Sequence, residues 1–237
     1  ESDEKVVSIC PSMGESCGLE NFKNQYKERL FDTGIAEAHA ITFAAGMAQK
    51  GFKPVVSVYS SFLQRAYDSV LHDVAIGGRH VTLAIDRAGV VGEDGETHQG
   101  VFDISFLSHI PGMAILAPCD NEMLHKMLSY AVLKHNGPIA VRYPKGSAPH
   151  IGGEFEFGKA ATLTSGGDVT IAALGTMVNT ALESFKILAE ENISAEVIDL
   201  RCAAPIDFET IFKSAEKTGV LVTIEDNVLS GGVGEKI

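Results

Sequence analysis

The chain repeatedly places a short apolar run, rich in β-branched residues, before a longer segment with helical periodicity. Five such runs precede residue 150, namely KVVSI (5–9), VVSVY (55–59), VTLAI (81–85), MAILA (113–117) and IAVRY (139–143). They are nearly all apolar rather than alternating, which is typical of strands buried on both faces of a parallel sheet. Helical patterns at 37–50, 62–76 and 120–135 lie between them. This order predicts an α/β fold in which helices cover a parallel sheet.

The pattern is interrupted and then resumes. Residues 149–168 include GGEFEFG and TSGGD, and their Gly-rich composition predicts a linker. A second α/β unit follows, with predicted strands and helices at 169–174, 177–191, 195–199, 207–217 and 220–224. We therefore expect a first domain at 1–148 and the N-terminal part of a second at 169–237. Because the sequence starts on a strand and stops within a Gly-rich motif, we expect a fragment of a longer polypeptide.

Charge and composition narrow the class of protein. The formal net charge of −12 opposes non-specific nucleic-acid binding, which needs a cationic face. No run of 18 apolar residues predicts a membrane span, and the N-terminus does not resemble a signal peptide. The cysteines are widely spaced without a CxxC pair, so a zinc ribbon is not expected. Reduced thiols in a cytoplasmic protein are the simplest interpretation.

One acid stands out in the first helical segment, DTGIAEAHAITFAAGMAQKG (32–51). Glu37 lies in its first turn among small residues. Acids are favoured there because they complement the helix dipole, so a structural role is the simpler interpretation. The small neighbours would also let a ligand approach the carboxylate closely. The helix alone does not choose between these two roles.

A Gly-rich polar segment, AIDRAGVVGEDGETHQGVFD (84–103), follows a predicted strand. It is long for a connection and lies where open α/β sheets place ligand loops. Asp94, Glu96 and His98 alternate in it, but without the register of an EF-hand, and we do not predict a metal site. His98 could donate or accept a proton near neutral pH. The alternative is a solvated surface loop.

Aromatic and basic residues follow two other predicted strands. Tyr59, Phe62 and Arg65 lie at a strand-to-helix junction and could face a site, although a core helix would also explain Phe62. Arg142 and Lys145, in VRYPKGS, could bind a phosphate or carboxylate, or could be surface charges. A further Gly-rich turn, GGVG before a predicted helix start near the C-terminus, is a weaker candidate for an anion site.

Together these stretches resemble a known family. FDTGIAEAHAITFAAGMA, YSSFLQRAYDSVLHDVAI, DRAGVVGEDGETHQGVFD and VRYPKGS are similar to the pyrimidine-binding domain of 1-deoxy-D-xylulose-5-phosphate synthases, which are thiamine-diphosphate enzymes of the transketolase superfamily. VIDLRCAAPID and TIEDNVLSGGVG resemble the start of their C-terminal domain. The resemblance covers essentially the whole chain. It implies a transferase that condenses pyruvate with glyceraldehyde 3-phosphate, with loss of CO2, for isoprenoid, thiamine and pyridoxal biosynthesis.

The resemblance also implies roles near the cofactor. Glu37 would hydrogen-bond N1′ of the aminopyrimidine ring, and Phe62 would stack on that ring. Tyr59, Asp94 and His98 would lie near the substrate and the reacting carbon. His98 is expected to handle a proton or to orient a carbonyl.

Four basic residues would bind substrate by the same resemblance. Arg87 and Lys145 match positions associated with the phosphate of the aldehyde. Lys145 departs from the family pattern, in which an Arg is familiar, and Lys offers a point charge rather than a bidentate fork. Arg65 and Arg142 are neighbouring candidates.

The family also has parts that this sequence does not show. Its members hold Mg2+ and the diphosphate on an N-terminal domain with a GDG…N-type motif, which we do not find here. We therefore expect this chain to supply the pyrimidine half of the site and to be inactive alone. Family members are homodimers, so a dimer is expected. The alternatives are a transketolase-like enzyme acting on ketose donors and a non-catalytic dimerisation module.

Overall fold

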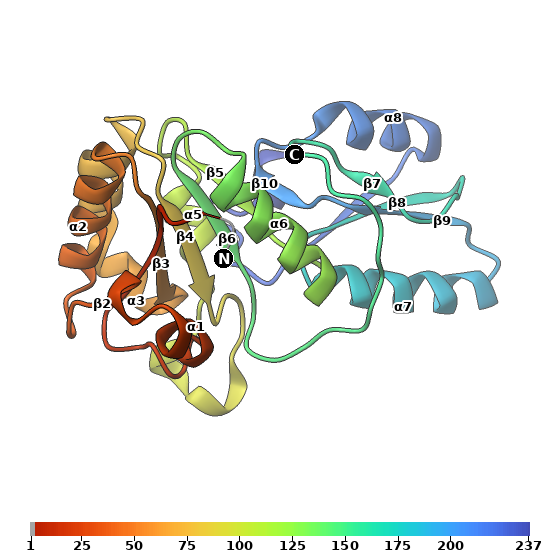
Figure 1. Cartoon of the computed structure of the whole chain (residues 1–237). Helices are drawn as coiled ribbons and strands as arrows, with labels where there is room; N and C mark the ends of the chain where they lie inside the picture. The colour runs from red at the N-terminus through yellow and green to blue at the C-terminus, as the bar shows by residue number, and fades with distance from the viewer. Residues whose placement is uncertain (1–2) are drawn as a thin grey trace.

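The computed structural model describes residues 3–237, which form two β-sheets flanked by helices (Figure 1). The first sheet has seven strands, in the order β10 (Cys202–Ala204), β5 (Ala114–Leu116), β6 (Ile139–Arg142), β4 (Thr82–Asp86), β3 (Lys53–Tyr59), β1 (Val6–Cys10) and β2 (Leu30–Asp32). Every neighbouring pair is parallel except β10 with β5. The predicted α/β fold with a mainly parallel sheet is confirmed.

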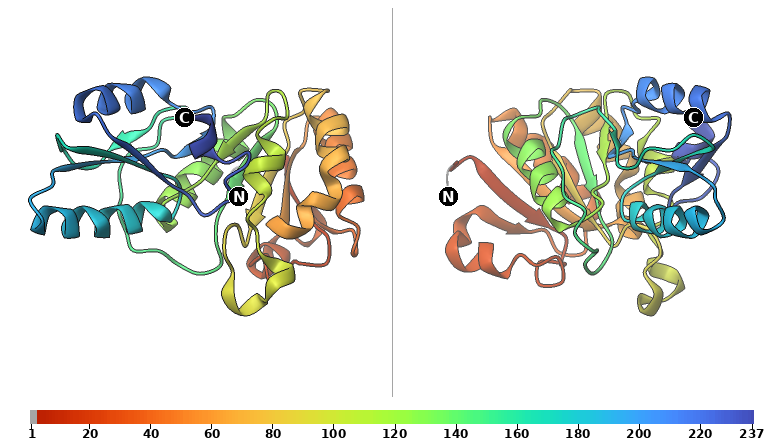
Figure 2. Two further views of the ribbon diagram at one scale, coloured as in Figure 1. Left: turned by 180° about the vertical axis from the view of Figure 1, so that it is seen from behind. Right: turned by 90° about the vertical axis from the view of Figure 1, so that its right-hand side faces the viewer.

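The second sheet has four strands, in the order β11 (Leu221–Ile224), β8 (Val169–Ala173), β9 (Ala195–Asp199) and β7 (Ala161–Thr162). Helices α7 (Met177–Glu190) and α8 (Phe208–Thr218) lie on opposite sides of it (Figures 1 and 2). β7 falls inside the stretch predicted to be a linker. β10 follows β9 along the chain yet joins the first sheet, so the two units share a strand pairing. The domain division at 148 and 169 stays a prediction.

The remaining helices vary in length. They are α1 (Glu20–Gln25), α2 (Glu37–Gln49), α5 (Asp103–Leu107), α6 (Asn121–Leu133) and α9 (Val233–Lys236), with 3-10 turns η1 (Lys27–Arg29), η4 (Gly92–Asp94) and η5 (Glu96–His98). The sequence predicted α2 and α6 but not the shorter α1 and α5, since one or two turns show little periodicity. Among residues 3–237, no helix combines the length and apolar character needed to cross a membrane.

The helix predicted at 62–76 is not continuous. It begins earlier and changes winding, as α3 (Ser60–Leu63), the 3-10 turn η2 (Gln64–Ala66), α4 (Tyr67–Ser69) and the π-helical η3 (Val70–Ala75). Ala66, Val70 and Val74, spaced four residues apart, are buried. Phe62 is only partly buried against the core, which leaves part of its ring accessible.

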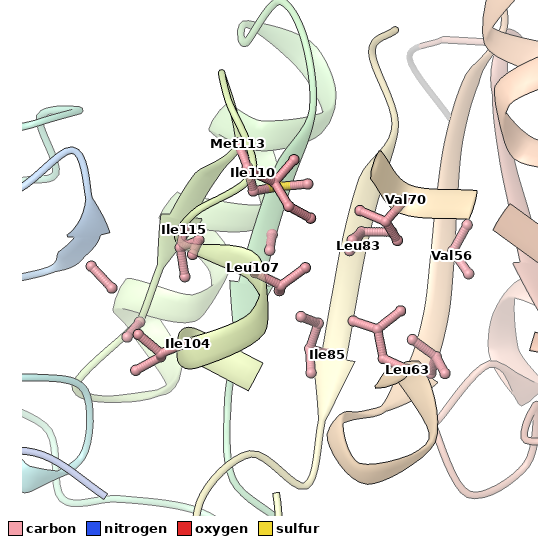
Figure 3. Close-up of a cluster of buried hydrophobic side chains, with 14 of the residues drawn as sticks. Val56, Leu63, Val70, Leu83, Ile85, Ile104, Leu107, Ile110, Met113 and Ile115 are labelled. Carbon is pink, nitrogen blue, oxygen red and sulfur yellow. The ribbon is translucent and has the colours of Figure 1, made fainter. Parts of the chain in front are cut away.

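The core lies on both faces of the first sheet because successive strand residues point to opposite sides. In β5, Ile115 belongs to one apolar cluster, whereas Ala114 and Leu116 belong to the other. The first cluster joins α2, the 60–75 segment and α5 (Figure 3). The second joins α6 and continues into the second sheet. Apolar packing therefore covers the sheet on both faces and fixes the position of the edge where its parallel strands end.

Candidate functional site

The site begins where β3 and β4 end side by side. Their parallel register places Tyr59 opposite Asp86, so the residues that follow each strand meet at one edge of the sheet. The Arg87 guanidinium carbon lies 4.0 Å from the centre of the Tyr59 ring. The Tyr59 and Phe62 rings stack with their centres 5.6 Å apart. Two of the predicted site aromatics and one predicted cation are therefore in contact.

Glu37 is the first residue of α2 and is only 6% exposed. The turn before it is held by Asp32, whose carboxylate accepts the backbone N–H groups of Ser12 and Gly34 at 2.9 Å each. Arg65 Nη1 donates to Glu37 Oε1 at 3.1 Å, and the Arg65 guanidinium lies over the Phe62 ring, 5.2 Å from its centre. Arg65 therefore contacts both Glu37 and Phe62, the two residues that the resemblance assigns to binding the pyrimidine ring.

The segment 87–100, here called the His98 loop, is closed at its base by two glycines. Gly89 N–H donates to the Gly100 carbonyl at 2.7 Å, and Gly100 N–H returns a bond of 2.8 Å. Gln99 braces the loop from within, through bonds to Val91 N–H and the Gly95 carbonyl. The loop is therefore internally hydrogen-bonded, although Gly92, Glu93 and residues 95–97 at its tip are exposed to solvent.

The imidazole of His98 packs against the rings of Tyr59 and Phe62. The His98 ring centre lies 5.1 Å from that of Phe62 and 6.4 Å from that of Tyr59, with edge-on geometry in both cases. His98 Nδ1 lies 3.0 Å from Thr97 Oγ1. Its Nε2 makes no hydrogen bond to the residues that the structure describes and can face a ligand.

A network of acids surrounds the two predicted phosphate-binding cations. Arg87 pairs with Asp86 (Nη1–Oδ2, 2.6 Å) and with Asp94 (Nε–Oδ2, 3.3 Å), and Lys145 pairs with Asp94 (2.7 Å) and Glu93 (3.0 Å). The hydrogen bond from Lys145 and the charges of both cations lower the pKa of Asp94. Burial raises the pKa of Asp86 although Arg87 opposes the shift. Asp94 therefore stays anionic and joins Arg87 to Lys145.

Arg142 lies away from this cluster. It is 3% exposed, and its guanidinium pairs with Asp103 (Nε–Oδ2, 2.9 Å) and Asp226 (Nη1–Oδ1, 3.0 Å). Burial lowers its pKa, but the two carboxylates outweigh that effect and hold the pKa above the usual range. In β6, the Arg142 side chain alternates with that of Val141 and so points toward α5 rather than α6. The structure therefore supports a structural role and does not bring it to the predicted substrate site.

The Gly-rich turn before α9 already holds an anion. The carboxylate of Glu225 accepts Val233 N–H at 2.9 Å and Gly234 N–H at 2.8 Å. The turn thus satisfies its own N–H groups and leaves no reason to expect an external anion. Within residues 3–237, no group of three or more His, Cys, Asp or Glu side chains is arranged to hold a metal.

Sequence reasoning missed two features of this edge. Asp103 and Asp226 hold Arg142 but gave no motif signal, because their pairing depends on the tertiary structure. A cavity of about 550 Å³ also opens beside the ends of β1 and β2, where Ser12, Lys23 and Asp32 are among its lining residues. Its walls come from segments whose short elements, α1 and β2, were not predicted.

Comparison with known proteins places this edge in context. Residues 1–150 match the family model for the transketolase pyrimidine-binding domain, and residues 158–237 match the transketolase C-terminal domain. The chain belongs to the transketolase pyrimidine-binding family. The resemblance inferred from the sequence motifs is confirmed by curated relatives that match nearly all of the chain. The chain is 48% identical over 240 residues to 1-deoxy-D-xylulose-5-phosphate synthase 1 of Geobacter sulfurreducens and 49% identical over 240 residues to the synthase of Clostridium tetani.

Both alignments cover 99% of this transketolase-family chain but 38% of the relative. The chain therefore spans less than two-fifths of the length of these relatives. A solved structure described as a split-gene transketolase, an inactive β4 tetramer, superposes with a TM-score of 0.89 at 31% identity, covering 98% of this chain and 77% of that one. Transketolase from Leishmania mexicana superposes with a TM-score of 0.79 at 21% identity, over 94% of this chain and 36% of that one, which shows the shared fold.

Proposed function

We propose that this chain is part of a 1-deoxy-D-xylulose-5-phosphate synthase, which condenses pyruvate with glyceraldehyde 3-phosphate and releases CO2. The observation that carries the proposal is the 48–49% identity to synthases along nearly the whole chain, against 31% to the split-gene transketolase. The clustering of Glu37, Phe62 and His98 at one sheet edge supports it. Thiamine diphosphate, when bound, supplies the electron sink for such chemistry.

The residues present fit the aminopyrimidine end of that cofactor. A flat heterocycle needs an aromatic surface and a carboxylate that can hydrogen-bond a ring nitrogen. Phe62 offers a partly exposed ring, and Glu37 has an oxygen, Oε2, without a hydrogen bond to the described residues. Arg65 now lies over Phe62, but its side chain is 60% exposed, so moving it away costs little. Glu37 would then hold a proton at N1′ of the bound ring.

The remaining side chains suit the substrates. His98 would hold or transfer a proton at Nε2, since Nδ1 faces Thr97. Arg87 and Lys145 would bind the phosphate of the aldehyde, and Asp94 joins them now. A phosphate would replace that carboxylate on one or both cations. The tight packing of Arg87 against Tyr59 would keep the phosphate at a fixed distance from the reacting atoms.

Other parts of the proposal lie outside this chain. Mg2+ and the diphosphate would be held by residues of the longer protein, and a cytoplasmic homodimer is the expected assembly. The chain alone is expected to be inactive. The solved relative described as an inactive β4 tetramer supports this expectation, because 77% of its chain is matched by this one. That relative also supports the alternative of a transketolase-like enzyme acting on ketose donors.

The test uses the complete polypeptide, or this chain mixed with a matching diphosphate-binding domain. CO2 release from pyruvate should depend on glyceraldehyde 3-phosphate as acceptor, whereas xylulose 5-phosphate should be a poor donor. Glu37→Gln should lower turnover by about 10²–10⁴-fold, because positioned proton transfer contributes that much, while the circular dichroism spectrum stays unchanged. Near-normal turnover by Glu37→Gln would contradict the assignment, and a preference for ketose donors would favour the alternative.

A further inference from the structure

We propose that Asp226, which follows β11 in the second unit, is a positioning residue that clamps the base of the His98 loop and thereby places His98. The inference rests on the proposed function, because only there does the position of His98 affect a reaction. Asp226 lies in the sequence far from the loop that it contacts, and no motif that we assigned to catalysis includes it.

The first contact is steric. Gly89 has a φ of +81°, and a Cβ built on it would lie 1.9 Å from Asp226 Oδ2. The carboxylate therefore fills the volume that any side chain at position 89 would need. Gly89 is also half of the glycine pair that closes the loop, through its two backbone hydrogen bonds with Gly100. Asp226 thus packs directly against the closure of the loop.

The second contact is electrostatic. Asp226 Oδ1 accepts from Arg142 Nη1 at 3.0 Å, and Arg142 Nε donates to Asp103 at 2.9 Å. Asp103 starts α5 immediately beyond the loop. One buried guanidinium therefore joins a carboxylate behind the loop to a carboxylate just after it. Charge-assisted hydrogen bonds of this kind are the strong ones, and burial limits their competition with water.

The backbone that follows Asp226 is hydrogen-bonded to the segment that follows the His98 loop. Val228 N–H donates to the Val101 carbonyl at 3.1 Å, and Ser105 Oγ donates to the Ser230 carbonyl at 2.9 Å. Gly231 approaches so closely that a Cβ there would lie 2.9 Å from that of Ser105. Figure 2 shows this dark-blue C-terminal segment beside the yellow-green segment that contains α5. These contacts fix the segment that carries Asp226 against the residues that follow the His98 loop.

The tip of the loop depends on this base. Glu93, Glu96 and Thr97 are exposed, and Lys145 holds the tip through half-exposed ion pairs with Glu93 and Asp94. The less exposed pair of Asp94 with Arg87 ties the tip to the start of the loop, and so to its base. Exposed pairs contribute little to rigidity. The buried base, in contrast, is attached through Gly89, Asp226 and Arg142. We infer that the base sets the orientation from which His98 reaches Phe62.

The adjacent acid provides a matched control. Glu225 points the other way and caps α9 through Val233 and Gly234. Asp226→Ala and Glu225→Ala therefore remove neighbouring carboxylates of the same segment with different contacts. Both variants are made in the complete polypeptide, and amide hydrogen exchange is followed by mass spectrometry without cofactor or substrate.

Asp226→Ala should speed amide exchange in peptides spanning 87–102 by about tenfold or more, because a buried charge-assisted contact is lost. Exchange in β8 should stay unchanged, which separates a local effect from general destabilisation. Glu225→Ala should speed exchange only around α9. In the active holoenzyme, Asp226→Ala should also lower kcat by at least tenfold, since misplacing a catalytic group has effects of this size.

Unchanged exchange at 87–102, or an equal rise there and in β8, would overturn the clamp. If Asp226→Ala does not fold, the shape-conserving Asp226→Asn is measured in the same way, with a smaller rise expected at the same peptides. A local rise in an enzyme without synthase activity would leave the clamp standing and remove the proposed function. Synthase activity with unchanged amide exchange at 87–102 would contradict the clamp and leave the proposed function standing.

Discussion

Replacing Arg142 by Met should lower the free energy of unfolding by roughly 3–5 kcal/mol, because removing one partner of a buried ion pair leaves uncompensated charge. Asp103 is 1% exposed and the Asp226 side chain 13%, so neither carboxylate can regain full hydration. Two charge-assisted hydrogen bonds, of 2.9 and 3.0 Å, are lost together. Met keeps much of the arginine volume, so the loss comes mainly from charge rather than from a cavity. Urea unfolding of the complete polypeptide at neutral pH measures it.

The triple variant Arg142→Met, Asp103→Asn, Asp226→Asn separates charge from packing. It removes the cation and both anions, and it should recover most of the lost stability because no unpaired charge remains. A loss below about 1 kcal/mol for Arg142→Met would refute the reasoning. Normal stability together with a raised KM for glyceraldehyde 3-phosphate would instead support the substrate contact that the sequence had predicted for Arg142.

Three further changes test other parts of the structure. Gly100→Ala would place a Cβ 2.1 Å from the Arg87 carbonyl oxygen, and it should lower the free energy of unfolding in urea by about 1–3 kcal/mol. The control Gly46→Ala lies at an open position in α2 and should raise that free energy by about 0.5–1 kcal/mol. Equal effects of the two substitutions would contradict the close approach at Gly100. Burial raises the pKa of Asp199 from 3.8 to about 6, so the folded chain binds that proton more tightly than the unfolded chain. The unfolding free energy should therefore fall as pH rises from about 4 to about 6, by up to about 1.4 kcal/mol per pH unit, and Asp199→Asn should flatten this part of the curve; identical slopes would contradict the shift. Arg87→Ala should raise the KM of the complete enzyme for glyceraldehyde 3-phosphate far more than its KM for pyruvate, and equal changes would count against a phosphate contact.

The parts of the fold that the sequence predicted are those with local signals. Strands β1, β3, β4, β5 and β6 of the parallel sheet are nearly continuous apolar runs, and α2, α6, α7 and α8 each have more than two turns of periodic pattern. β10 has three residues and pairs with β5 from another part of the chain, so no local pattern indicates it. The changes of winding between Ser60 and Ala75 were equally invisible, because the buried residues Ala66, Val70 and Val74 keep the four-residue spacing of a continuous α-helix.

In the candidate site, too, some features could be predicted from local signals and others could not. Tyr59 and Arg87 meet because each follows a strand end, and parallel strands bring their carboxyl ends together. That geometry could be predicted once the strands were located. The direction of the Arg142 side chain could not, since VRYPKGS does not show which face of the sheet each residue occupies. Its partner Asp226 lies 84 residues away, beyond the reach of any spacing argument.

The second unit therefore contributes to the site edge as well as to its own sheet. β10 extends the first sheet at β5, and Asp226 supplies one of the two carboxylates that pair with Arg142. A chain cut at the linker would keep Glu37, Phe62 and His98 but lose both contributions. Arg142 would then have Asp103 as its one carboxylate partner, and the Gly89–Gly100 closure would be open on the side that Asp226 now covers. From the proposed clamp we therefore expect that the smallest piece holding His98 in place extends beyond residue 148 to include Asp226.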